Sequence, residues 1–253
     1  MNKLGVESII SNICGKNKDM NSHLFSADMK QADVIHADYS LLLLLHRFGI
    51  NLGFGDKTVR ECCEANHVSC TLFLMICNVY SNEQDLPTEE EIEGIGGNVD
   101  QLIAYLKNSH SYYLENRMLS IQEQLKEISE GCEQQHQQIL NLFFNEYKNE
   151  VIRHFDYEEV TVFPYISNMV KGARPGDYEI GVFRENHSTI DDTLTYLKNI
   201  IMKYLPGDTL SDMRIRVLFG IFALEEDLSK QYLIEDKILV PLVMKLEQRY
   251  AKQ

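Results

Sequence analysis

The sequence predicts an all-α fold, with a small helical N-terminal domain followed by an up-down-up-down bundle of four helices. After residue 98, apolar residues recur at steps of three and four in four long segments, as they do in amphipathic helices. Glycine and proline interrupt these segments near residues 131, 172–176 and 206–207. Since these breaks are short, consecutive helices are expected to be antiparallel neighbours in one bundle.

The N-terminal part shows shorter helical signals. The apolar run Leu41–Leu45 predicts a buried helix, and Thr58 with Glu61 three residues later matches a capping box at the start of another. Acidic residues, glycines and Pro87 then form the best linker candidate in the chain. The expected division is a small helical domain over 1–82, a linker over 83–97 and the bundle over 98–253.

Composition and charge exclude several classes of function. The chain has 253 residues, 44% of them hydrophobic, with a formal net charge of −14 and a pI near 5.0. A chain this acidic is repelled by nucleic-acid phosphates and anionic membranes, so we expect neither as a partner. Its apolar runs are no longer than six residues, whereas a membrane span needs about 20. With no export signature at the N-terminus, the expected location is the cytoplasm.

The six cysteines contain no C-x-x-C pair, so neither a zinc ribbon nor a thioredoxin-like motif is expected. In a reducing compartment they are predicted to be free thiols, most of them small core residues.

The bundle segments contain an internal repeat at an offset of 77 residues. The matched pairs are His110 with His187, His154 with Gln231, Glu158 with Glu235, and Pro164 with Pro241. The repeat predicts two helical hairpins related by a pseudo-two-fold axis.

The repeated positions carry residues that can bind a metal. His154 and Glu158 are four residues apart, and therefore neighbours on a helical face that is otherwise apolar. A buried carboxylate is costly unless it is paired or coordinates a metal. Mixed imidazole and carboxylate ligation suits iron, and bundles build dinuclear carboxylate sites in this way. The candidate ligands are His110, His154, Glu158, His187, Gln231 and Glu235.

A purely structural interpretation stays open for each candidate. His154 with Glu158 can be a helix-stabilising pair, and His110 and His187 can be satisfied core histidines. Glu235 can be a solvated acid beside Asp236. Gln231 can be a ligand, a partner of a ligand or a bystander.

The motif H-x-x-x-E-E-x-x-x-F-P is present as His154, Glu158, Glu159, Phe163 and Pro164. With the repeat, it resembles the hemerythrin-like (HHE) cation-binding domain, in particular the repair-of-iron-centres di-iron proteins, over about residues 100 to 250. The resemblance implies a hemerythrin-type bundle that holds a di-iron centre.

The resemblance also assigns ligand roles. His110 and His154 would bind one iron, His187 and the residue at 231 the other, and Glu158 and Glu235 would bridge them. The family usually has histidine where this chain has Gln231, whose amide carbonyl is a weaker ligand. The N-terminal part resembles the small domain that precedes the family's bundle, but the Cys-Cys turn of that domain is replaced by Asn51–Asp56.

The implied function is that of a cytoplasmic non-haem di-iron protein of the stress response, which binds O2 or NO and acts in iron–sulfur cluster repair. Iron–sulfur proteins and a second copy of the chain are its candidate protein partners. Two alternatives remain: a non-catalytic O2 or NO sensor or iron-binding module, and a structural bundle with a degenerate metal site. Whether the chain is an enzyme is left open.

Overall fold

The computed structural model describes residues 23–130, 132–173, 178–186, 191–205 and 210–251. The described residues are helical and contain no strand beyond an isolated antiparallel bridge between Lys30 and Thr58. The predicted all-α class is therefore confirmed. None of the helices in this part of the chain combines the length and apolar character that crossing a membrane requires.

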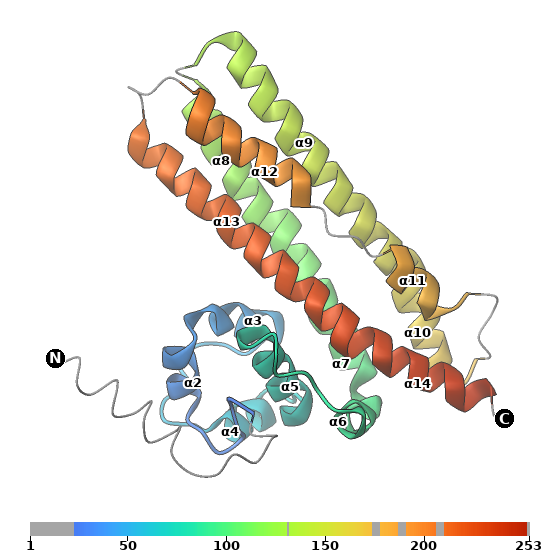
Figure 1. The fold of residues 1–253 in the computed structure, drawn as a ribbon. Helices are drawn as coiled ribbons and strands as arrows, with labels where there is room; N and C mark the ends of the chain where they lie inside the picture. The colour runs from blue at the N-terminus through green and yellow to red at the C-terminus, as the bar shows by residue number, and fades with distance from the viewer. Residues whose placement is uncertain (1–22, 131, 174–177, 187–190, 206–209, 252–253) are drawn as a thin grey trace.

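The N-terminal part forms short helices that pack against the bundle. They are α2 (Gln31–Ala37), η1 (Tyr39–Leu41), α3 (Leu42–Arg47), α4 (Val59–Ala65) and α5 (Cys70–Ser81). Helix α4 begins at the predicted capping box. The Thr58 hydroxyl accepts a hydrogen bond from the Glu61 backbone amide, and the Glu61 carboxylate accepts one from the Thr58 backbone amide. Helix α3 contacts α7 (Val99–Tyr112), and α5 contacts α13 (Ser211–Ile234), as Figure 1 shows at the lower side of the bundle.

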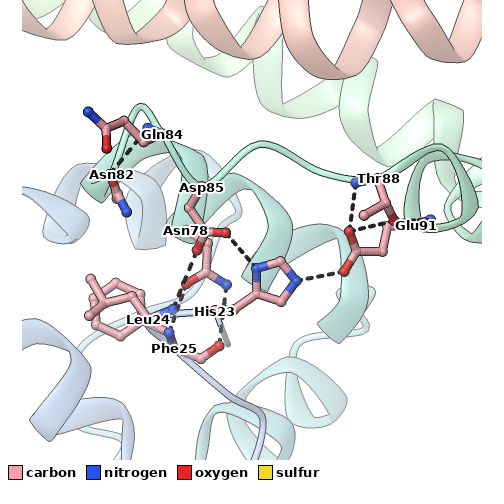
Figure 2. A network of polar contacts seen from close by, with 9 residues as sticks. All are labelled: His23, Leu24, Phe25, Asn78, Asn82, Gln84, Asp85, Thr88 and Glu91. Atoms are coloured by element: carbon pink, nitrogen blue, oxygen red, sulfur yellow. Dashed lines mark hydrogen bonds and ion pairs between the residues drawn. The ribbon is translucent and has the colours of Figure 1, made fainter. Parts of the chain in front are cut away.

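The stretch predicted as a linker contains helical turns of its own. Helix α6 (Glu89–Gly94) starts at a second capping box, Thr88 with Glu91, and the turn η2 (Gly96–Asn98) leads into α7. His23 fastens this stretch to the start of the described chain. Its Nδ1 lies 2.8 Å from Asp85 Oδ1 and its Nε2 lies 2.6 Å from Glu91 Oε1 (Figure 2).

Four long helical segments make up the bundle (Figure 1). The first segment consists of α7, the π-helical turn η3 (Tyr113–Arg117) and α8 (Met118–Ser129), and the second of α9 (Gln134–Tyr157), η4 (Glu158–Val162) and α10 (Phe163–Val170). The third contains α11 (Ile180–Asn186), α12 (Asp191–Asn199) and η5 (Ile200–Tyr204). The fourth consists of α13, η6 (Glu235–Leu239) and α14 (Val240–Ala251). Contacts run from α8 to α9, from α9 to α12, from α12 to α13 and from α13 back to α8. The segments thus close around a common interior.

The second and fourth segments repeat each other in structure as well as in sequence. Helices α9 and α13 both have 24 residues, and each ends at a π-helical turn of 5 residues that begins with a glutamate, Glu158 or Glu235. In each case a single residue separates the end of the turn from a proline, Pro164 or Pro241. Because proline lacks an amide donor and crowds the carbonyl four residues earlier, a wider turn before it relieves the crowding.

The buried side chains follow the same repeat. Those of α9 and their counterparts 77 residues later in α13 are all buried: Leu140, Phe144, Tyr147, Val151 and Phe155 in the first, and Val217, Ile221, Leu224, Leu228 and Tyr232 in the second. These residues belong to the core cluster inside the long part of the bundle. A second cluster joins the N-terminal helices to α7, α10 and α14. His110 and Glu158 lie along their helices where one cluster gives way to the other.

The cysteines of the described residues are free thiols. Cys62, Cys63 and Cys77 are buried, while Cys70 and Cys132 are partly buried. Cys14 lies outside the described residues.

Candidate metal centre

Glu158 is the centre of the candidate site. It is the first residue of η4, its side chain is fully buried, and it faces two imidazoles. Its Oε2 lies 2.9 Å from His110 Nε2, and its Oε1 lies 3.1 Å from His154 Nε2. Burial alone would raise the pKa of this carboxyl, but the hydrogen bonds from His110 and His154 outweigh burial and hold the pKa well below its ordinary value. Glu158 is therefore a buried carboxylate anion.

His110 is fixed on every side. It projects from α7, is 1% exposed, and stacks on the Phe155 ring with 3.9 Å between centroids. Its Nε2 faces Glu158, while its Nδ1 lies 2.9 Å from Glu159 Oε1. Burial acts to lower the pKa of this imidazole, but the two carboxylates more than compensate and the pKa is raised.

The fourth segment contributes Gln231 and Glu235, both fully buried. Gln231 Nε2 donates a hydrogen bond of 2.8 Å to Glu235 Oε1. The carbonyl oxygen of Gln231, Oε1, has no hydrogen-bond partner among the described residues. An unsatisfied buried acceptor of this kind costs about 1–3 kcal/mol, and a cation beside it would remove that cost.

The structure brings three predicted ligands from three different segments to one point. Ligand atoms of His110, Glu158 and Glu235 all lie within 4.8 Å of one another. His154 joins the group through Glu158, and Gln231 joins it through Glu235. His187 lies outside the described residues. Glu235 is buried rather than solvated, which removes one of the structural interpretations left open by the sequence.

The donor set suits a metal ion. Imidazole nitrogens and carboxylate oxygens are the ligands that iron takes in helical bundles. The orphaned Gln231 oxygen provides one more donor in the same interior. That these residues bind metal remains a prediction, and it is supported by the gathering of His110, Glu158 and Glu235 in one buried interior.

A buried ion pair next to this site could not be predicted from the sequence. Arg47 of α3 binds Asp227 of α13 through two hydrogen bonds, 3.0 Å from Nη1 to Oδ1 and 2.5 Å from Nη2 to Oδ2. Tyr80 donates to Asp227 Oδ1 at 2.7 Å, and Tyr113 donates to the Asp227 backbone oxygen at 3.1 Å. Asp227 lies four residues before Gln231 on the same helix. The N-terminal helices are therefore joined to the helix that carries half of the site.

A bundle of long helices with histidine and glutamate gathered in its interior defines a cation-binding helical protein. In agreement, the model of the hemerythrin HHE cation-binding domain matches residues 101–243, more than half of the chain. The chain belongs to this family. Neither a curated protein nor a solved structure matches it significantly.

Proposed function

We propose that this protein is a non-haem di-iron protein. The observation that carries the proposal is the convergence of His110, Glu158 and Glu235 within 4.8 Å in a buried interior. Charged side chains are rarely buried in such numbers unless they are paired or coordinate a metal. His110 and His154 would hold one iron, and His187 and Gln231 the other. Glu158 and Glu235 would lie between the two ions.

Bound iron would supply an open coordination position for a small diatomic ligand, O2 or NO. The residues around it serve two purposes. Phe155 and Phe163 stack on His110, and Tyr113 stacks in turn on Phe155, so aromatic rings keep bulk water away from the imidazole. The buried carboxylates hold negative charge that compensates the cations. We further propose a cytoplasmic role in nitrosative and oxidative stress, with iron–sulfur proteins as clients in cluster repair and a homodimer as the candidate assembly.

The test is an anaerobic titration of reduced, iron-reconstituted protein with NO and, separately, with O2. Saturable changes in the absorption spectrum with either gas support the proposal, and their absence contradicts it. His154→Ala serves as the comparison, because it removes one proposed ligand that is only partly buried. Production of nitrous oxide under reducing conditions distinguishes a reductase from a sensor that only binds the gas.

One observation favours a second candidate, a mononuclear metal binder. Gln231 donates its amide hydrogen to Glu235, so that carboxylate oxygen is partly engaged before any metal binds. A carboxamide is also a weaker iron ligand than imidazole. A stoichiometry of one iron per chain, unchanged by excess iron, would select this second candidate.

A further inference from the structure

Two consecutive glutamates hold the two nitrogens of one imidazole. Glu158 faces His110 Nε2 at 2.9 Å, and Glu159 faces His110 Nδ1 at 2.9 Å. Successive residues of a regular helix point about 100° apart. Here both reach the same ring, because η4 is a wider π-helical turn and His110 lies across it from α7.

The two carboxylates have different surroundings. Glu158 is fully buried and belongs to the group of potential ligands with Glu235. The Glu159 side chain is 42% exposed and is not part of that group. An imidazole binds metal through one nitrogen, and its other N–H usually donates to a carboxylate, which fixes the tautomer and the ring orientation. In His110, the nitrogen that faces the buried acids is Nε2, and the nitrogen on the solvent side is Nδ1.

We infer that Glu159 is a positioning residue for the metal centre: it accepts the hydrogen bond from Nδ1–H of His110, competes with Glu158 for the ring proton, and so frees the Nε2 lone pair for the metal. This inference rests on the proposed metal binding at His110. Glu159 touches neither the metal nor the diatomic ligand, and it acts only through His110. The stacking of Phe155 on the ring restrains its tilt, whereas the bond to Glu159 selects which nitrogen carries the proton.

The experiment compares Glu159→Ala, Glu159→Gln and Asp156→Asn with the wild type. Asp156 is an exposed acid on the same helix, so its variant controls for the loss of one surface charge. Iron affinity is measured by competition with a chelator, and thermal unfolding of the metal-free proteins reports any structural damage. We expect Glu159→Ala to weaken iron binding by about 10–100-fold without lowering the apo melting temperature. Glu159→Gln, whose amide oxygen still accepts from Nδ1–H, should restore most of the affinity.

A second readout does not depend on metal. Nitrogen chemical shifts of His110 in the metal-free protein, at a pH where the ring is neutral, show which nitrogen is protonated. Because Glu158 and Glu159 compete for the one ring proton, we expect a measurable share of the Nδ1–H tautomer in the wild type and in Asp156→Asn, and the Nε2–H tautomer alone in Glu159→Ala, where Glu158 is the remaining acceptor. An unchanged tautomer in Glu159→Ala overturns the inference, as does wild-type iron affinity in that variant. A wild type that binds no iron but shows the expected tautomer shift contradicts the proposed function and leaves Glu159 as the residue that orients His110.

Discussion

The segments 134–170 and 211–251 follow the same order of long helix, π-helical turn and proline-bearing helix, but they present different side chains at the candidate site. The lengths of α9 and α13, the π-helical turns, the prolines and the buried core positions agree at an offset of 77 residues. The first segment places His154 and Glu158 beside His110, whereas the second places Gln231 and Glu235 in contact with each other. The repeat therefore preserves the shape of the bundle more strictly than the ligands it presents.

The π-helical turns explain how the shape of the bundle can be preserved while the ligands differ. Each glutamate begins a π-helical turn of the same length, and a proline, Pro164 or Pro241, follows the turn after one further residue. The position of the carboxylate is thus determined by the backbone. The residue four positions earlier, His154 or Gln231, can change without altering the helix. We therefore expect the two halves to contribute unequally to metal binding.

Removing the central carboxylate should have the largest effect. Glu158→Ala deprives both His110 and His154 of their partner, and we expect iron binding to be abolished. Glu235→Ala removes the carboxylate that accepts a hydrogen bond from Gln231 and leaves the group of His110, His154 and Glu158 in place, so we expect it to retain iron at reduced affinity. Iron content after reconstitution and desalting measures both. Equal iron content in the two variants would contradict the inequality of the halves.

The ion pair at Asp227 distinguishes the second half in a different way. The matched residue in the first half is Glu150. Among the described residues, no side chain of the N-terminal helices forms an ion pair with it. Asp227→Ala leaves Arg47 buried without its carboxylate, and breaking a buried pair costs about 3–5 kcal/mol. Urea unfolding should show this loss, whereas Glu150→Ala should change the free energy of unfolding by less than about 1 kcal/mol.

Recovery of stability would confirm the electrostatic cause. In the double variant Arg47→Met with Asp227→Leu, neither charge is left unpaired, so much of the stability should return. A double variant as unstable as Asp227→Ala would instead indicate that packing around Tyr80 and Tyr113 is responsible.

Converting the second half to the pattern of the first should strengthen it. In Gln231→His an imidazole replaces the weak carboxamide ligand, and we expect the weaker iron to bind at least about tenfold more tightly, since even outer-sphere changes alter affinity by about 10–100-fold. The reciprocal variant His154→Gln should weaken the other iron. Chelator competition measures both, and no change in either variant would argue against ligation at these positions.

The smallest effect concerns the N-terminal part and pH. The hydrogen bond to Glu91 raises the pKa of His23, and burial opposes this effect. With the further bond to Asp85, the pKa of His23 lies above 6.5. A raised pKa in the folded state gives stability that is fully present below 6.5 and is lost as the pH rises through the folded value. Such exposed pairs contribute about 0.2–1 kcal/mol. His23→Gln should therefore be less stable than the wild type at pH 6 and nearly equal to it under alkaline conditions; an equal difference at both would refute the ion-pair origin.

The sequence predicted much of this arrangement because it depends on local periodicity. The offset of 77 residues and the spacing of His154 and Glu158 identified the residues that the structure brings together. The role of Glu159 was not predicted, because a regular helix would point it away from His110. The pair of Arg47 and Asp227 was not predicted because 180 residues separate its members. The capping box at Thr88 and Glu91 carried the same signal as Thr58 and Glu61, but the surrounding acids and glycines favoured a linker.

The most direct test of the di-iron proposal is the metal content of protein purified without affinity metals and then supplied with iron, measured by mass spectrometry together with the absorption spectrum. We predict close to two irons per chain and near-ultraviolet bands of a coupled iron pair. A stoichiometry of one iron, or none after iron supplementation, would contradict the proposal and show that the substitution at Gln231 has abolished the second site.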